Sequence, residues 1–138
     1  MKLLVNIDVD DLGRAEAFYL QALGLSVCRR FGSSGVELRG AACPVFLLVK
    51  PAGSPAASRI SQSRDYARHW TPVHLDFQVD DVDAAVARAV AAGAVLEDTI
   101  QTHVWGRIAH LADPFGHGFC LLTMLGRGYD EIAEPNPG

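Results

Sequence analysis

The sequence predicts an α+β fold made of two β-α-β-β-β modules, and three observations lead to this prediction. Residues 73–79 (VHLDFQV) alternate apolar and polar side chains, as a strand with one buried face does. An Asp-Asp pair follows, and residues 82–92 then place apolar side chains at helical spacing until Gly93. The same order occurs 70 residues earlier, where residues 9–12 (VDDL) match residues 79–82 (VDDV). This internal repeat indicates two copies of one module.

The first module is predicted to occupy residues 1–50. A strand near its start leads into a helix from Leu12 to Leu23, which Gly24 ends. The Asp-Asp pairs suit the starts of both helices, because carboxylates accept hydrogen bonds from unpaired N–H groups and meet the positive end of the helix dipole. Three further strands are expected in this module, at residues 26–31, 36–39 and 45–50.

The second module is predicted to occupy residues 73–125, after a linker at residues 51–72 that is rich in proline, glycine and serine. A helical turn within the linker is left open, and its arginines, Arg59, Arg64 and Arg68, are expected to be solvated. After the second helix, strands are expected around residues 95–102, 107–112 and 118–124. The turn at residues 113–116 (DPFG) precedes the last strand, and residues 126–138 are expected to form a flexible tail.

Size and composition restrict the class of protein. The 138 residues suit one domain, and each half is too small to fold alone, so the modules are expected to share one core. Hydrophobic residues make up 49% of the chain and charged residues 20%, which is typical of a globular protein. A net charge of −4 gives no electrostatic basis for binding nucleic acid.

Neither a membrane segment nor a disulfide framework is expected. No apolar run reaches the roughly 18 residues that a membrane-spanning helix needs. The first residues turn polar too early for a signal peptide. Cys28, Cys43 and Cys120 are widely spaced and odd in number, which fits a reducing compartment. We therefore expect a cytoplasmic protein with no membrane partner.

Three motifs of this chain also occur together in a known superfamily. They are the acidic pair ahead of each helix, Phe18-Tyr19 followed by Leu23-Gly24-Leu25, and the turn at residues 113–116 followed by His117. Together they resemble the vicinal oxygen chelate superfamily, which includes glyoxalase I, extradiol dioxygenases and the bleomycin and fosfomycin resistance proteins. The resemblance covers about residues 3–125. It implies two strongly curved mixed sheets that form a barrel or cup with the helices outside, a small-molecule partner and a homodimer.

The resemblance also implies where a metal ion would bind. Metal-bearing members place ligands on the first and last strands of each module, and the alignment puts Leu4, Leu47, His74 and Cys120 there. The leucines carry no donor atom, and Cys120 stands where the family has a glutamate. Two ligands are fewer than the three that catalytic zinc usually takes from a protein, and magnesium or manganese prefers oxygen donors. We therefore expect no metal cofactor, with His74 the only strong ligand candidate and a divalent ion at a new site as the alternative.

Without a metal, the cup is expected to bind a small molecule. Polar side chains on its predicted inner faces lie beside aromatic ones, which is the usual composition of a ligand site. We predict a metal-free binder of an aromatic or antibiotic-like molecule, with Trp70 and Trp105 either as stacking walls or as core residues. The predicted ligand-binding residues are Asn6, Asp8, Phe46, Trp70, Gln78, Trp105 and Cys120.

An enzyme is the alternative hypothesis. His74 and Asp76 share one face of a strand, where the carboxylate would orient the imidazole, so they are the predicted catalytic pair. With this pair, or with a metal, the chain would be a lyase, an isomerase or a dioxygenase. The later histidines, His103, His110 and His117, match no helical metal motif, and His117 is expected to be exposed in its turn. A third hypothesis is a vestigial cup whose chain acts by pairing with itself or with another protein.

Overall fold

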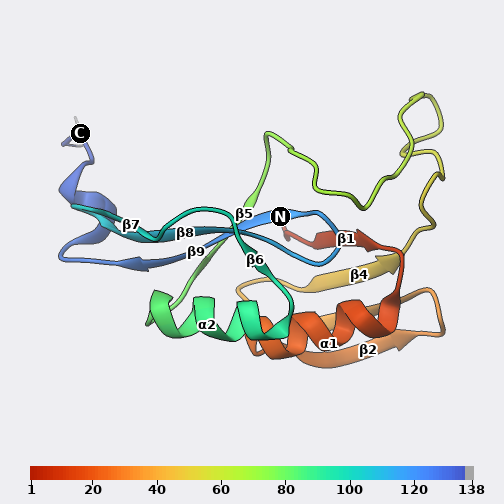
Figure 1. Cartoon of the computed structure of the whole chain (residues 1–138), viewed down its shortest axis with the longest axis horizontal. Coiled ribbons are helices and arrows are strands. Elements are labelled where there is room, and N and C mark those ends of the chain that lie inside the picture. Colours follow the sequence, from red (N-terminus) through yellow and green to blue (C-terminus); the bar gives the residue numbers. More distant parts are fainter. Residues whose placement is uncertain (136–138) are drawn as a thin grey trace.

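Two open, mixed β-sheets and two α-helices make up the described part of the chain, residues 1–135 of the computed structural model (Figure 1). The first sheet contains β1 (Val5–Val9), β2 (Ser26–Phe31), β3 (Gly35–Arg39) and β4 (Val45–Val49) in the order β1-β4-β3-β2. Strand β1 runs parallel to β4, and the other neighbours are antiparallel. The strands predicted for the first module are therefore confirmed.

The second sheet repeats this arrangement with one additional interruption. It contains β5 (Leu75–Gln78), β6 (Val95–Leu96), β7 (Gln101–His103), β8 (Gly106–Ala112) and β9 (Gly118–Met124), in the order β5-β9-β8-β6 with β7 also paired to β8. Strand β5 runs parallel to β9 as β1 does to β4. The single strand expected around residues 95–102 is two short strands, since residues 97–100 leave the ladder between them. Neither sheet closes on itself, so the predicted fold takes the form of a cup and not of a barrel.

The two helices, α1 (Leu12–Leu23) and α2 (Val82–Ala92), have the predicted bounds. The side chain of Asp11 accepts a hydrogen bond from Arg14 N at 3.0 Å, and that of Asp81 accepts one from Ala84 N at 3.1 Å. Each helix ends at a glycine with a positive φ, a conformation that glycine adopts without a steric penalty. No helix among the described residues is long and apolar enough to cross a membrane.

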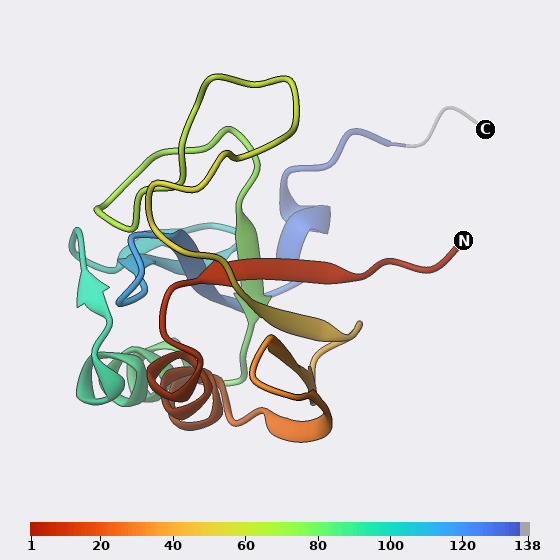
Figure 2. The ribbon, with the colours of Figure 1, turned by 90° about the vertical axis from the view of Figure 1, so that its right-hand side faces the viewer.

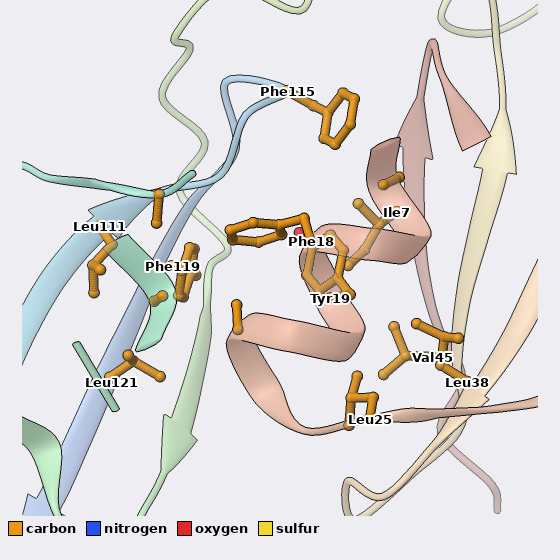
Figure 3. Packing of buried hydrophobic residues seen from close by; sticks show 14 of the residues in the cluster. Ile7, Phe18, Tyr19, Leu25, Leu38, Val45, Leu111, Phe115, Phe119 and Leu121 are labelled. Atoms are coloured by element: carbon orange, nitrogen blue, oxygen red, sulfur yellow. The ribbon is translucent and has the colours of Figure 1, made fainter. Parts of the chain in front are cut away.

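One hydrophobic core joins the two modules. Helix α1 packs against α2 and presents Phe18 and Tyr19 between the sheets, as Figure 3 shows. The Phe18 ring meets that of Phe119 on β9 edge-on, with centroids 6.4 Å apart. Residues of the first sheet, including Leu38 and Val45, belong to the same buried cluster as residues of the second, including Leu111 and Leu121. The prediction of a shared core is confirmed.

The linker at residues 51–72 crosses from the first sheet to the second without forming a helix. It lies on the opposite side of β1 and β5 from the two helices (Figures 1 and 2). Arg64 Nε donates to the Asp8 carboxylate at 2.8 Å, and Arg68 donates to both Glu97 oxygens at 2.7 and 2.8 Å. Arg64 is half-buried, so the expectation that it is solvated was wrong. Arg59 and Arg68 are exposed as expected, although Arg68 also pairs with a carboxylate that is distant in sequence.

The segment predicted to be a flexible tail begins with an ordered turn. A 3₁₀ helix, η1 (Gly128–Glu131), follows β9, and the Tyr129 ring lies with its centroid 5.1 Å from that of Trp105. Leu125 N also donates to Trp105 O at 2.9 Å. The start of this segment therefore rests on the β7–β8 hairpin, and Pro137 and Gly138 lie outside the described residues.

Candidate functional site

A cluster of three polar side chains lies on the face of the second sheet that points away from the helices. Leu75 and Phe77 pack towards the core, so their neighbours His74 and Asp76 project from the other face. Cys120 on β9 joins them, because the strand register pairs it with Asp76. His74 Nδ1 lies 2.9 Å from Asp76 Oδ1, and the donor atoms of the three residues all lie within 4.8 Å of one another.

The thiol of Cys120 is neutral in this environment. Its burial, and then the charge and hydrogen bond of Asp76, raise the pKa of Cys120 to about 12. Because the thiolate is the nucleophile, Cys120 in the metal-free chain does not act as one near neutral pH. It lines the site as a small polar side chain.

Two cavities meet at His74. One of about 270 Å³ lies over β8 and β9, and its lining includes His74, Cys120, His110 and Trp70. The other, of about 340 Å³, lies between β1 and the end of the linker, and its lining includes His74, Asn6, Asp8 and His69. Polar groups from both modules therefore surround one imidazole.

A third, more apolar cavity of about 510 Å³ lies between the modules, beside the edges of β1 and β5. Asp76 and Gln78 are among its few polar lining residues. Of the predicted ligand-binding residues, Asn6, Asp8, Trp70, Gln78 and Cys120 line one of these three cavities.

The two remaining predicted residues lie elsewhere. Phe46 is on the open face of the first sheet, where it stacks on Phe31 with ring centroids 6.1 Å apart. Trp105 lies between His103 and Tyr129 at the β7–β8 hairpin, with its ring 5.3 Å from that of His103. Neither residue lines a cavity that His74 or Asp76 lines. Trp70 differs from Trp105, because 79% of its surface is exposed at the rim of the 270 Å³ cavity.

His117 is a part of the site that sequence reasoning missed. It was expected to be exposed, yet it is half-buried, with Nδ1 2.9 Å from His69 Nε2 and Nε2 2.7 Å from the backbone oxygen of Asp8. These contacts tie the linker to β1 and to the turn before β9. The turn motif indicated only local geometry, and no signal in the sequence pointed to partners 48 and 109 residues away.

One predicted metal position was also wrong. Leu47 is fully buried in the hydrophobic core and pairs with Ile7, so it faces α1 and not the cup. The position that corresponds to Cys120 is Phe46. Phe46 pairs with Asn6 on β1, just as Cys120 pairs with Asp76 on β5. Repeat alignment placed β4 one residue out of register, and such a shift exchanges the two faces of a strand.

The corrected register leaves the family's metal site incomplete in this chain. Leu4 precedes β1 and is 52% exposed, and Phe46 carries an aromatic ring. Neither side chain has a donor atom. Only His74 and Cys120, both in the second module, remain at the inherited positions, so the residues present do not fit a metal held between the two modules.

Comparison with known proteins decides the family. A family model described as a glyoxalase-like domain matches residues 4–122. The chain belongs to the glyoxalase-like family. Its superfamily is therefore the vicinal oxygen chelate superfamily that the sequence motifs resemble, and the resemblance is confirmed.

Three similar proteins illustrate the range of this family. The anthracycline biosynthesis protein DauV of Streptomyces sp. (strain C5) is 31% identical over 122 residues, which are 87% of this chain and 40% of DauV. The uncharacterized protein Mb0911c of Mycobacterium bovis is 31% identical over 119 residues, which are 84% of this chain and 78% of that protein. A solved glyoxalase/bleomycin resistance protein/dioxygenase family enzyme from Burkholderia phytofirmans PsJN gives a TM-score of 0.72 at 24% identity, covering 88% of this chain and 97% of that one. This glyoxalase-like chain thus spans less than half of DauV, and its likeness to the Burkholderia enzyme establishes the fold alone.

Proposed function

We propose that this glyoxalase-like protein binds a planar aromatic molecule in the two cavities that meet at His74. The observation that carries the proposal is the convergence of donors and acceptors from both modules on one hollow face. His74 offers a ring nitrogen and Asn6 an amide. His69 and Asp8 line the same hollow, where they also contact His117 and Arg64. Polar groups placed beside apolar side chains such as Leu111 and Phe119 are the usual composition of a small-molecule site.

An exposed aromatic side chain supports a flat ligand. Trp70 stands at the rim of the 270 Å³ cavity with 79% of its surface in solvent. A planar ring that enters this cavity would cover the indole, and stacked aromatic pairs contribute roughly 0.5–1.5 kcal/mol beyond the area that they bury. The similarity to DauV, named for anthracycline biosynthesis, agrees with a fused-ring ligand.

The second candidate function is acid–base catalysis on such a ligand. The contact of 2.9 Å between His74 Nδ1 and Asp76 Oδ1 favours it. A carboxylate accepts hydrogen bonds only, so His74 carries its proton on Nδ1 and presents Nε2 as a base. A base in this position would remove a proton from a carbon next to a carbonyl group, as an isomerase or a lyase requires.

Calorimetric titration with a hydroxyanthraquinone tests the binding proposal. We expect the Kd to rise at least tenfold in His74→Ala and severalfold in Trp70→Ala, because each change removes a group that faces the ligand. Trp105→Ala is the matched control, since Trp105 lines neither cavity, and its Kd should stay unchanged. Equal affinity in all four proteins would refute the site.

The same variants separate the binder from the enzyme. Hydrogen–deuterium exchange at a carbon next to a carbonyl of the bound probe, followed by NMR in D₂O, reports proton removal directly. If the protein is an enzyme, Asp76→Asn should slow this exchange at least tenfold while the Kd changes little. A probe that binds but exchanges no faster than in buffer would leave the binder as the function.

A further inference from the structure

The cluster on the second sheet has the geometry of a metal site. The donor atoms of His74, Asp76 and Cys120 all lie within 4.8 Å of one another. In a tetrahedral zinc site, bonds of 2.0–2.3 Å put neighbouring ligand atoms roughly 3.5 Å apart. The ladder between β5 and β9 holds Asp76 and Cys120 opposite each other, so their side chains leave the sheet side by side.

The type of donor restricts which ion this cluster would take. It offers an imidazole nitrogen, a carboxylate oxygen and a sulfur, and sulfur ligands select zinc and similar ions over magnesium and manganese. Other charged groups nearby are already engaged. Both carboxylate oxygens of Glu97, which lines the adjoining cavity, accept hydrogen bonds from Arg68.

Space for a fourth ligand lies directly beside the cluster. His74 and Cys120 both line the cavity of about 270 Å³, and so does His110, which pairs with Cys120 across β8 and β9. Three protein ligands with an open position are the arrangement of catalytic zinc sites. An ion held here would therefore face the space in which the organic ligand is proposed to bind.

We propose that His74, Asp76 and Cys120 bind a zinc-like divalent ion within the second module alone. This site differs from the inherited one, whose first-module positions, Leu4 and Phe46, carry no donor atoms, because Asp76 takes their place. The proposal goes beyond the proposed function, since neither ligand binding nor acid–base catalysis requires an ion. It takes up the alternative of an ion at a new site, in place of the expectation of no metal.

Titration of the reduced protein with Co²⁺ tests this site through a signal that needs no activity. As the Co–S bond forms, the Cys120 thiol gives its proton to the buffer and a thiolate-to-cobalt charge-transfer band appears in the near ultraviolet. We expect one equivalent of Co²⁺ to saturate the band and one equivalent of Zn²⁺ to remove it. Millimolar Mg²⁺ should leave it unchanged.

Matched variants assign the ligands. Cys120→Ser should abolish the band, and His74→Ala and Asp76→Ala should each weaken Co²⁺ binding at least tenfold. Cys43→Ser is the control, because Cys43 lies outside the cluster, and this variant should bind Co²⁺ as the unchanged protein does. His74 and Asp76 are exposed, so these two variants remain folded and informative even if Cys120→Ser does not. The proposal would be overturned if no band appeared or if the band survived in Cys120→Ser. It would also be overturned if His74→Ala and Asp76→Ala bound Co²⁺ as tightly as the unchanged protein does. These outcomes do not depend on the result with the anthraquinone.

Discussion

At the scale of single residues, Asp113 shows how one turn residue connects the two modules. Its Oδ1 accepts hydrogen bonds from Phe115 N at 2.8 Å and His117 N at 2.9 Å, and its Oδ2 accepts one from the Tyr19 hydroxyl at 2.5 Å. Tyr19 belongs to α1 and is only 3% exposed. Burial, and then the charge of Asp113, raise the pKa of Tyr19 well above its usual value, so the phenol stays a neutral donor.

Removing this donor should destabilise the protein without changing its shape. In Tyr19→Phe the buried Asp113 carboxylate loses a hydrogen bond, and an unsatisfied buried group costs about 1–3 kcal/mol or more if it is charged. Urea unfolding at pH 7 should show a free energy of unfolding that is lower by this amount. Tyr129→Phe is the control, because Tyr129 is 49% exposed and should lose little. Equal stability of the two variants would mean that the Tyr19 hydroxyl contributes nothing measurable.

The residues of the site differ in whether a short stretch of sequence is enough to place them. The alternation of residues 73–79 was enough to place His74 and Asp76 on one face, because strand geometry alone sets that relation. Their contact with Cys120 depended on the register of β5 and β9, and the Asp-Pro-Phe-Gly turn fixed that register correctly. Leu47 was misplaced because the first module has no equivalent turn before β4 to mark the register.

At the scale of elements, both helices were predictable to the residue, since the signals that start and stop them are local. Asp11 and Gly24 bound α1, and the second helix has the same pattern. The interruption between β6 and β7 was not predictable in this way, because residues 97–100 leave the ladder where Glu97 meets Arg68 of the linker. That contact spans 29 residues and has no counterpart in the first module.

The stability that the fold gains from the ion pair between Arg68 of the linker and Glu97 should depend on pH. The hydrogen bond from Arg68 lowers the pKa of Glu97 below its ordinary 4.5. A carboxyl whose folded-state pKa is depressed stabilises the fold above its unfolded pKa, and this contribution is lost as the pH falls through the folded pKa. Both groups are partly exposed, so solvent screening limits the effect to at most about 1 kcal/mol.

Substitution of the arginine tests this dependence. Arg68→Gln should melt at a lower temperature than the unchanged protein at pH 7, and the gap should close as the pH is lowered from 5 towards 3. Arg59→Gln is the matched control, because Arg59 lies in the same linker and makes no ion pair within the described residues, so this variant should melt as the unchanged protein does. A gap that persists at pH 3 would show that Arg68 acts through packing against the linker and not through the charge of Glu97.

At the scale of the whole molecule, the repeat and the shared core set the architecture together. Each module covers one face of its sheet with a helix and leaves the other face open, and α1 and α2 pack so that both covered faces meet in one cluster. The open faces carry the polar side chains that form the candidate site. Sequence alone predicted this division from periodicity, whereas the partners across it, such as Asp8 with Arg64, required the folded chain.

A shared core predicts that the chain unfolds as one unit. Phe18 on α1 contacts Tyr19 beside it and Phe119 across the module boundary, and it is 2% exposed. Phe18→Ala should therefore lower the free energy of unfolding by about 3–5 kcal/mol, as large cavities in cores do. This loss of stability should affect both sheets equally, and hydrogen exchange measures it for each sheet. Amides of β4 in the first module and of β9 in the second should lose protection by the same factor. If only β1–β4 lost protection, the modules would be separate folding units, and the cup between them would be a hinged interface instead of a fixed one.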